Sequence, residues 1–153
     1  MKYLLLILLT LSTAAQAELE EWYKKAIKVP NPNELPLLTA TSGCESSIKE
    51  DFRSVVEGVL VRSRIKPLQI AEHFTKPEKY PINLNAAVSC VADLELYTFL
   101  IAVSFGRINL EEGVNFIVPY GSIGRNETAV IKNEVKKSIE RAITDYVKVN
   151  FDL

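Results

Sequence analysis

Two cysteines, Cys44 and Cys90, are the residues of this chain with the clearest covalent chemistry. In an oxidising compartment they form the one available intramolecular pair. A bridge between them closes a loop of ~45 residues and stabilises a fold by about 3 to 4 kcal/mol. The alternatives are two buried thiols, which cysteine tolerates well, and an activated thiolate, which requires a reduced cysteine. For an exported chain, the pair favours a structural disulfide.

A glycine-containing stretch at residues 120–128 has the residue types of an anion site. It follows an apolar alternating segment and precedes a helical pattern, and backbone N–H groups at such a junction can bind an anion. Glu127 opposes this use because its charge repels the same ligand. The other interpretation is a tight turn followed by a helix cap at Asn126 or Thr128. The candidate anion-binding residues are Gly121, Ser122, Gly124 and Arg125.

Other catalytic groups are sparse. The chain has one histidine, His73, beside Glu72, and a zinc site needs three or four ligands at recognisable spacing. We expect His73 to lie at the surface or to cap a turn. Acidic pairs at 93/95 and 111/112 lie in expected turns, where carboxylates are common without a catalytic reason. We therefore assign no catalytic residue, metal or cofactor, and the sequence favours a non-enzymatic protein.

Composition narrows the class of protein further. The 153 residues are 48% hydrophobic and 24% charged, with a formal net charge of -1. Proteins that bind nucleic acid usually carry a basic patch or a high pI, and here the pI is about 5.9. These values indicate one folded domain and no nucleic-acid partner.

The first residues have the pattern of a secretory signal peptide. A lysine precedes the apolar run Leu4–Leu11, and the small-residue pattern Ala15-Gln16-Ala17 follows. The run is too short to span a membrane, so we expect no membrane span. We expect residues 1–17 to be removed and the chain to be periplasmic, with secretion from the cell as the alternative.

A short amphipathic helix is predicted next, within residues 18–36. Leu19, Trp22, Tyr23, Ala26 and Ile27 form one apolar helical stripe, and prolines then indicate an extended linker up to residue 36. The stripe either closes the core of the domain or docks on a partner, for which Trp22 and Tyr23 are reasonable anchors.

Residues 37–153 are predicted to form a single α+β domain. Apolar spacing predicts helices over 47–61 and 126–149, with one helical turn at 70–74. Period-two alternation predicts a hairpin from 82–90 and 97–105, a third strand at 114–120, and an edge strand at 64–68. The predicted fold is a two-layer sandwich, in which a mainly antiparallel sheet of three to four strands packs against two main helices.

The strands carry more apolar residues than one core requires. On the face opposite the predicted core lie Leu96, Leu100 and Ile117, together with Ala87, Val91 and Ala102. Two helices cover one face of a sheet, so either the Trp22 helix or another chain must cover the second. We therefore expect an interaction protein with a homodimer or an envelope protein as partner. The alternative is a small hydrolase or anion-binding protein that uses residues 121–126.

The succession of elements also resembles that of some protein families. Tyr80-Pro81, Ile82–Asn85, Gly121-Ser122 and Ile143–Val147 resemble segments of short uncharacterised secreted proteins of proteobacteria. The order of helix, edge strand and hairpin is similar to the amino-terminal domain of the Tol-Pal translocation protein and to envelope accessory lipoproteins. This resemblance implies a periplasmic location and supplies no catalytic residue.

Overall fold

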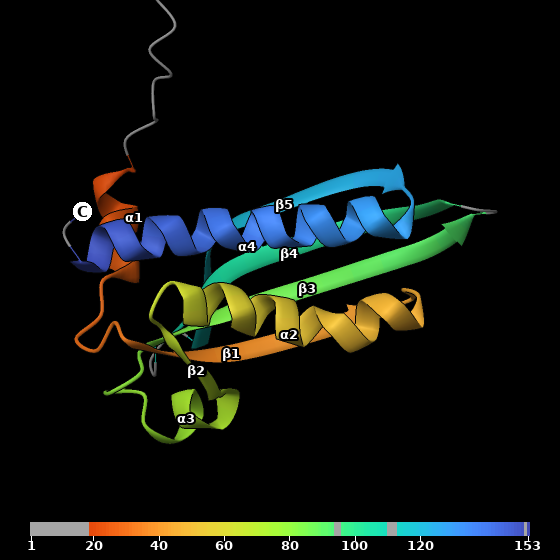
Figure 1. The fold of residues 1–153 in the computed structure, drawn as a ribbon. Helices are drawn as coiled ribbons and strands as arrows, with labels where there is room; N and C mark the ends of the chain where they lie inside the picture. Colours follow the sequence, from red (N-terminus) through yellow and green to blue (C-terminus); the bar gives the residue numbers. More distant parts are fainter. Residues whose placement is uncertain (1–18, 94–95, 110–112, 152) are drawn as a thin grey trace, which may run out of the picture.

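Five strands form one mixed sheet, and two long helices cover one of its faces (Figure 1). The computed structural model describes residues 19–93, 96–109, 113–151 and 153, including their side chains except at 108–119. The expected signal peptide, residues 1–17, lies outside this description. The elements are α1 (Glu21–Ile27), β1 (Glu34–Ser42), α2 (Ser46–Arg62), β2 (Lys66–Gln69), α3 (Ile70–Thr75), β3 (Ile82–Asp93), β4 (Leu96–Asn109), β5 (Gly113–Asn126) and α4 (Thr128–Phe151).

The strand order is β2-β1-β3-β4-β5. β1 runs parallel to both of its neighbours, and β3, β4 and β5 form an antiparallel meander. α2 contacts β1 and β2, α4 contacts β4 and β5, and the two helices contact each other. The predicted α+β class with helices over a sheet is confirmed, and the predicted helices, hairpin and edge strand are all present.

The core lies between the sheet and the two long helices. α2 and α4 each direct one apolar stripe toward the sheet. The stripes include Phe52 and Val56 of α2 and Ile139 and Ile143 of α4, all of which are buried. The strands contribute every second residue, such as Leu84 opposite Phe105. Because strand side chains alternate, the intervening residues point away from both helices. The sheet therefore has one buried face and one face that α2 and α4 leave uncovered.

β1 is a strand that the sequence analysis did not foresee. Residues 18–36 were expected to end in a proline-rich linker, yet β1 begins at Glu34 and lies inside the sheet. Leu35 and Leu37 face the helices and are almost fully buried. Pro36 is tolerated because pairing with β3 begins one residue later, at Leu37. The expected domain boundary at residue 37 therefore falls within this strand, and the sheet has five strands rather than three or four.

α1 packs at the end of α4 rather than over the uncovered face (Figure 1). Its C-terminal carbonyls are held by side chains from distant elements. Arg107 of β4 donates from its Nη2 to the Ala26 oxygen at 2.9 Å, and Asn150 of α4 donates to the Ile27 oxygen at 3.0 Å. Charged and amide donors at a helix C-terminus satisfy carbonyls that have no partner within the helix. α1 is thus part of the helical layer.

Candidate functional site

The uncovered face of the sheet carries large apolar side chains at its centre. Leu38 is 44% exposed, Val91 69%, Leu100 51% and Ile123 76%. They come from four adjacent strands and project on the side opposite α2 and α4. Small residues lie between them on the same face. We define the outer-face patch as Leu38, Ala40, Ala87, Val91, Leu100, Ala102, Gly121 and Ile123.

The strand register arranges the outer-face patch in rows across the sheet. One row contains only small residues, Ala40, Ala87, Ala102 and Gly121, each opposite the next. The adjacent row runs from Ser89 to Leu100 and Ile123. Large side chains project far from the backbone of the sheet, whereas alanine and glycine project little or not at all. A ridge at Leu100 and Ile123 therefore borders a shallow trough.

Gly121 is required by the packing of the backbone at the end of this trough. A Cβ atom at this position would lie 2.1 Å from the carbonyl oxygen of Ile101 in β4. Any larger residue would push β4 and β5 apart. The low surface of the trough is thus built into the pairing of these two strands.

Polar groups bound the outer-face patch, and their charges are balanced. At the end nearest the β3–β4 turn, Arg125 pairs with Asp93 at 2.6 Å. At the other end, Asn83 donates to the Oδ1 of Asn85 at 2.6 Å, across Gly106. Because these polar groups are partnered within the chain, the patch presents a neutral apolar centre within a polar rim.

The predicted partner-facing residues are only partly brought together. Leu100 is exposed on the outer face as expected, and Leu96 lies half-buried on the same side at the start of β4. Ile117 is opposite Phe105 in the register, and its side chain lies outside the described residues. Trp22 and Tyr23 belong to α1, which packs elsewhere. Leu38 and Ile123 were not predicted to lie on this face because β1 and the second half of β5 were not predicted, and neither segment alternates between apolar and polar residues.

Tyr23 packs α1 against the rest of the domain and is not available to contact a partner protein. It is 3% exposed, whereas its neighbour Trp22 is 53% exposed. The hydroxyls of Tyr23 and Tyr120 are hydrogen-bonded, and the Tyr120 hydroxyl donates to Asp145 at 2.8 Å. Burial raises the pKa of Tyr23 to about 12 and raises the pKa of Tyr120 still further, so both hydroxyls keep their protons. The network joins α1, β5 and α4.

The candidate anion-binding residues do not form a turn. Residues 121–125 continue β5, so the prediction of a tight turn at this position was wrong. Alternation along the strand directs Gly121 and Arg125 outward and Ser122 and Gly124 toward the helices. The glycines are explained by close neighbours, because a Cβ at Gly124 would lie 3.1 Å from the ring of Phe99. Arg125, the charged member of the set, is paired with Asp93 at 2.6 Å.

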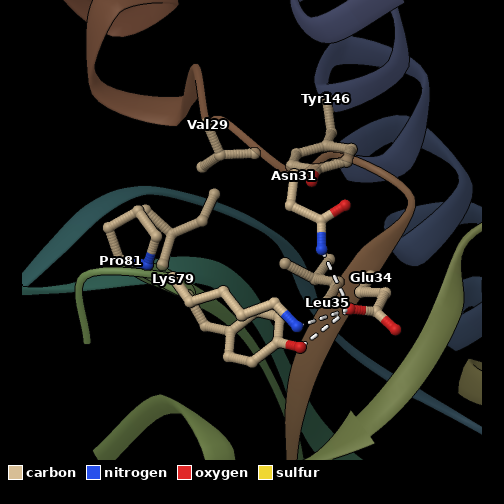
Figure 2. A pocket seen from close by; sticks show the side chains of 9 residues that line it. Val29, Asn31, Glu34, Leu35, Lys79, Pro81 and Tyr146 are labelled. Atoms are coloured by element: carbon tan, nitrogen blue, oxygen red, sulfur yellow. Dashed lines mark hydrogen bonds and ion pairs between the residues drawn. The ribbon is translucent and has the colours of Figure 1, made fainter. Parts of the chain in front are cut away.

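A small hollow lies where β1 begins, beside the end of α4 (Figure 2). Glu34 is its polar centre and accepts hydrogen bonds from Tyr80 at 2.7 Å and Asn31 at 2.9 Å. These bonds lower the pKa of Glu34, chiefly the one from Tyr80. Lys79 lies 3.6 Å from the same carboxylate. The hollow holds essentially no space for a water molecule, so this cluster joins chain segments rather than receiving a ligand.

Within the described ranges, histidine, cysteine and acidic side chains do not gather in any group of three or more that could hold a metal ion. In the same ranges, every helix is too short or too polar to cross a membrane.

No family model matches the chain, and no curated protein matches it. Among solved structures, the chain is similar to a PelC variant from Paraburkholderia phytofirmans, described as a dodecamer, with 13% identity and a TM-score of 0.47 over 78% of this chain and 91% of that one. A second PelC dodecamer from the same organism has 13% identity and a TM-score of 0.41, over 71% and 86%. Similarities at this level assign neither a family nor an assembly to the chain.

His73 is buried rather than exposed, which corrects the expected surface position. It is 1% exposed, and its Nδ1 lies 2.6 Å from the carbonyl oxygen of Tyr80. Because a carbonyl can only accept, Nδ1 carries the proton and Nε2 is a lone-pair acceptor. Nε2 is buried without a hydrogen-bond partner among the described residues. Burial lowers the pKa of His73 below its ordinary value of 6.5, and the bond to Tyr80 opposes this shift.

This buried imidazole should make the free energy of unfolding depend on pH. The unfolded chain takes up a proton near pH 6.5, whereas the folded chain does so at a lower pH. Stability is therefore complete above pH 6.5 and decreases as the pH falls through the folded-state pKa. The pH profiles of urea unfolding for wild type and for His73→Asn, which keeps a donor near the Nδ1 position, should diverge as the pH falls below 6.5. Parallel pH profiles for the two proteins would contradict this account.

Proposed function

We propose that this protein is an exported, non-enzymatic interaction module that binds a partner through the outer-face patch. The observation that carries the proposal is a sheet face with four large exposed apolar side chains, which neither α2 nor α4 covers. Exposed apolar surface is unfavourable by roughly 25 cal/mol per Å² relative to buried surface. A contiguous patch with a polar rim is typical of a surface that is covered by a partner.

Export is supported by two independent features. The N-terminal residues have the pattern of a cleaved signal peptide, with a basic residue, an apolar run and small residues. The structure contains a disulfide between Cys44 and Cys90, and such bonds persist mainly in oxidising compartments. Together they favour the periplasm.

Three polar side chains that could take part in catalysis form hydrogen bonds that hold the fold together. Glu34 joins Tyr80 to β1, and Arg107 holds the C-terminus of α1. His73 ties α3 to the chain before β3. These hydrogen bonds hold chain segments together, which favours binding over catalysis.

Site-directed cross-linking would test the proposal in the native compartment. A photo-reactive phenylalanine analogue placed at Leu100 should form covalent adducts with protein in intact cells, because this position is at the centre of the outer-face patch. The matched control is the same analogue at Val61, which is 61% exposed on α2. Adducts at Leu100 with few at Val61 support the proposal, and equal yields or none at Leu100 would overturn it.

A further inference from the structure

We infer that the partner of the outer-face patch is a second copy of this chain, packed face to face. The inference rests on the proposed function and names its partner. The pattern of rows carries it, since on β4 and β5 the ridge residues Leu100 and Ile123 lie beside the trough residues Ala102 and Gly121. A surface that contains both a ridge and its matching trough can be complementary to itself.

A two-fold axis between the two rows brings ridge and trough together. If the axis runs across the strands, each strand lies over its own copy in the opposite direction. Leu100 of one copy then faces Ala102 of the other, and Ile123 faces Gly121. Each contact occurs twice, as an isologous interface requires. The arrangement is the aligned packing of two sheets, in which side chains of the facing surfaces interdigitate about 10 Å apart.

Charge also favours a second copy over a charged partner. The ionic groups at the border of the patch, Asp93 and Arg125, already pair with each other. Packing two such faces therefore buries no unpaired charge, which would otherwise be a strongly unfavourable term. A lipid surface would instead require unpaired basic side chains around the patch.

The size of the patch sets the expected strength of association. Four strands spaced about 4.8 Å apart, over about 26 Å of their length, give a footprint of roughly 500 Å² per copy. Two copies then bury about 1,000 Å² in total, at the lower end for specific interfaces. The dimer should therefore dissociate on dilution rather than be permanent.

Sedimentation velocity over a range of concentrations tests this geometry. The disulfide-bonded exported protein should shift from monomer to dimer as concentration rises. On β4, Leu100→Ala removes the ridge residue and Ala102→Leu fills the trough, so each change should raise the dimer Kd by roughly tenfold or more. The double variant exchanges ridge and trough, and dimerisation should recover. Val61→Ala is the control, and thermal unfolding of every variant checks that the monomer is folded.

The outcomes separate this inference from the proposed function. Recovery in the double variant supports the face-to-face register, because unspecific apolar contact would not depend on which row holds the leucine. Two results overturn the inference: a monomer at every concentration, or a double variant no better than the single changes. If the chain is monomeric yet Leu100 forms adducts with a different protein in cells, the proposed function stands and self-association is wrong. If neither occurs, both are wrong.

Discussion

Replacing Cys44 and Cys90 by alanine should lower the free energy of unfolding by about 3 to 4 kcal/mol. The disulfide joins positions 46 residues apart, linking the segment after β1 to β3. Without the bridge, the unfolded chain regains the conformational entropy of this loop. Both cysteines are buried in the core, so reduction also forces two thiol groups into the space that the disulfide occupied. For a domain of ordinary stability, this loss is a large share of the total.

Urea unfolding with and without reductant measures this effect. The reduced wild type and the double alanine variant should have similar midpoints, well below that of the oxidised protein. Gly43, which precedes Cys44, must remain glycine in these variants. Its φ is 67°, and a Cβ atom there would lie 2.0 Å from the carbonyl oxygen of Cys90. Alanine at the two cysteines leaves that glycine in place. Equal midpoints for oxidised and reduced protein would show that the bridge contributes nothing.

Tyr23→Ala should destabilise the protein by about 3 to 5 kcal/mol, while Trp22→Ala should have little effect. The two residues are adjacent and both aromatic, which makes them a matched pair. Tyr23 is buried between α1, β5 and α4, so truncation leaves a cavity and removes the hydroxyl partner of Tyr120. Trp22 is more than half exposed, so its truncation removes little buried surface.

A third substitution separates packing from hydrogen bonding at this position. Tyr23→Phe keeps the ring and loses only the hydroxyl, and Tyr120 retains its bond to Asp145. Its effect should be about 1 kcal/mol. Chemical unfolding of the three variants provides the measurement. If Trp22→Ala is as destabilising as Tyr23→Ala, the orientation of α1 described above is wrong.

The contrast between Trp22 and Tyr23 could not be predicted from the sequence. The apolar stripe correctly predicted a helix, and it included both Trp22 and Tyr23. A stripe has a width of about 100° or more, so it indicates a face and does not say which member is at its centre. Two hydrogen bonds from residues remote in sequence fix the orientation of α1 so that Tyr23 points inward. One joins the hydroxyls of Tyr23 and Tyr120, and the other joins Arg107 to the carbonyl oxygen of Ala26.

The outer-face patch was anticipated in part for the same reason. Alternation along 82–90 and 97–105 placed Ala87, Leu100 and Ala102 on one face of a hairpin. Leu38, which extends that face, belongs to a strand whose partners are far away in sequence. Its pairing with β3 is parallel and begins at Leu37 opposite Leu84. The local sequence pattern does not predict which distant strand pairs in parallel with this segment, and the nearby prolines suggested a linker instead.

Local periodicity and residue type are enough to predict several features of this protein. These are the two long helices, the antiparallel hairpin, the α+β class and the cysteine pair, whose bond the structure contains. Tertiary structure alone decided that β1 lies inside the sheet, that residues 121–125 continue β5, and that α1 joins the helical layer. The physical reason is that backbone pairing and burial are satisfied between segments distant along the chain. Those contacts leave the outer-face patch exposed, and that patch is where we expect the partner to bind.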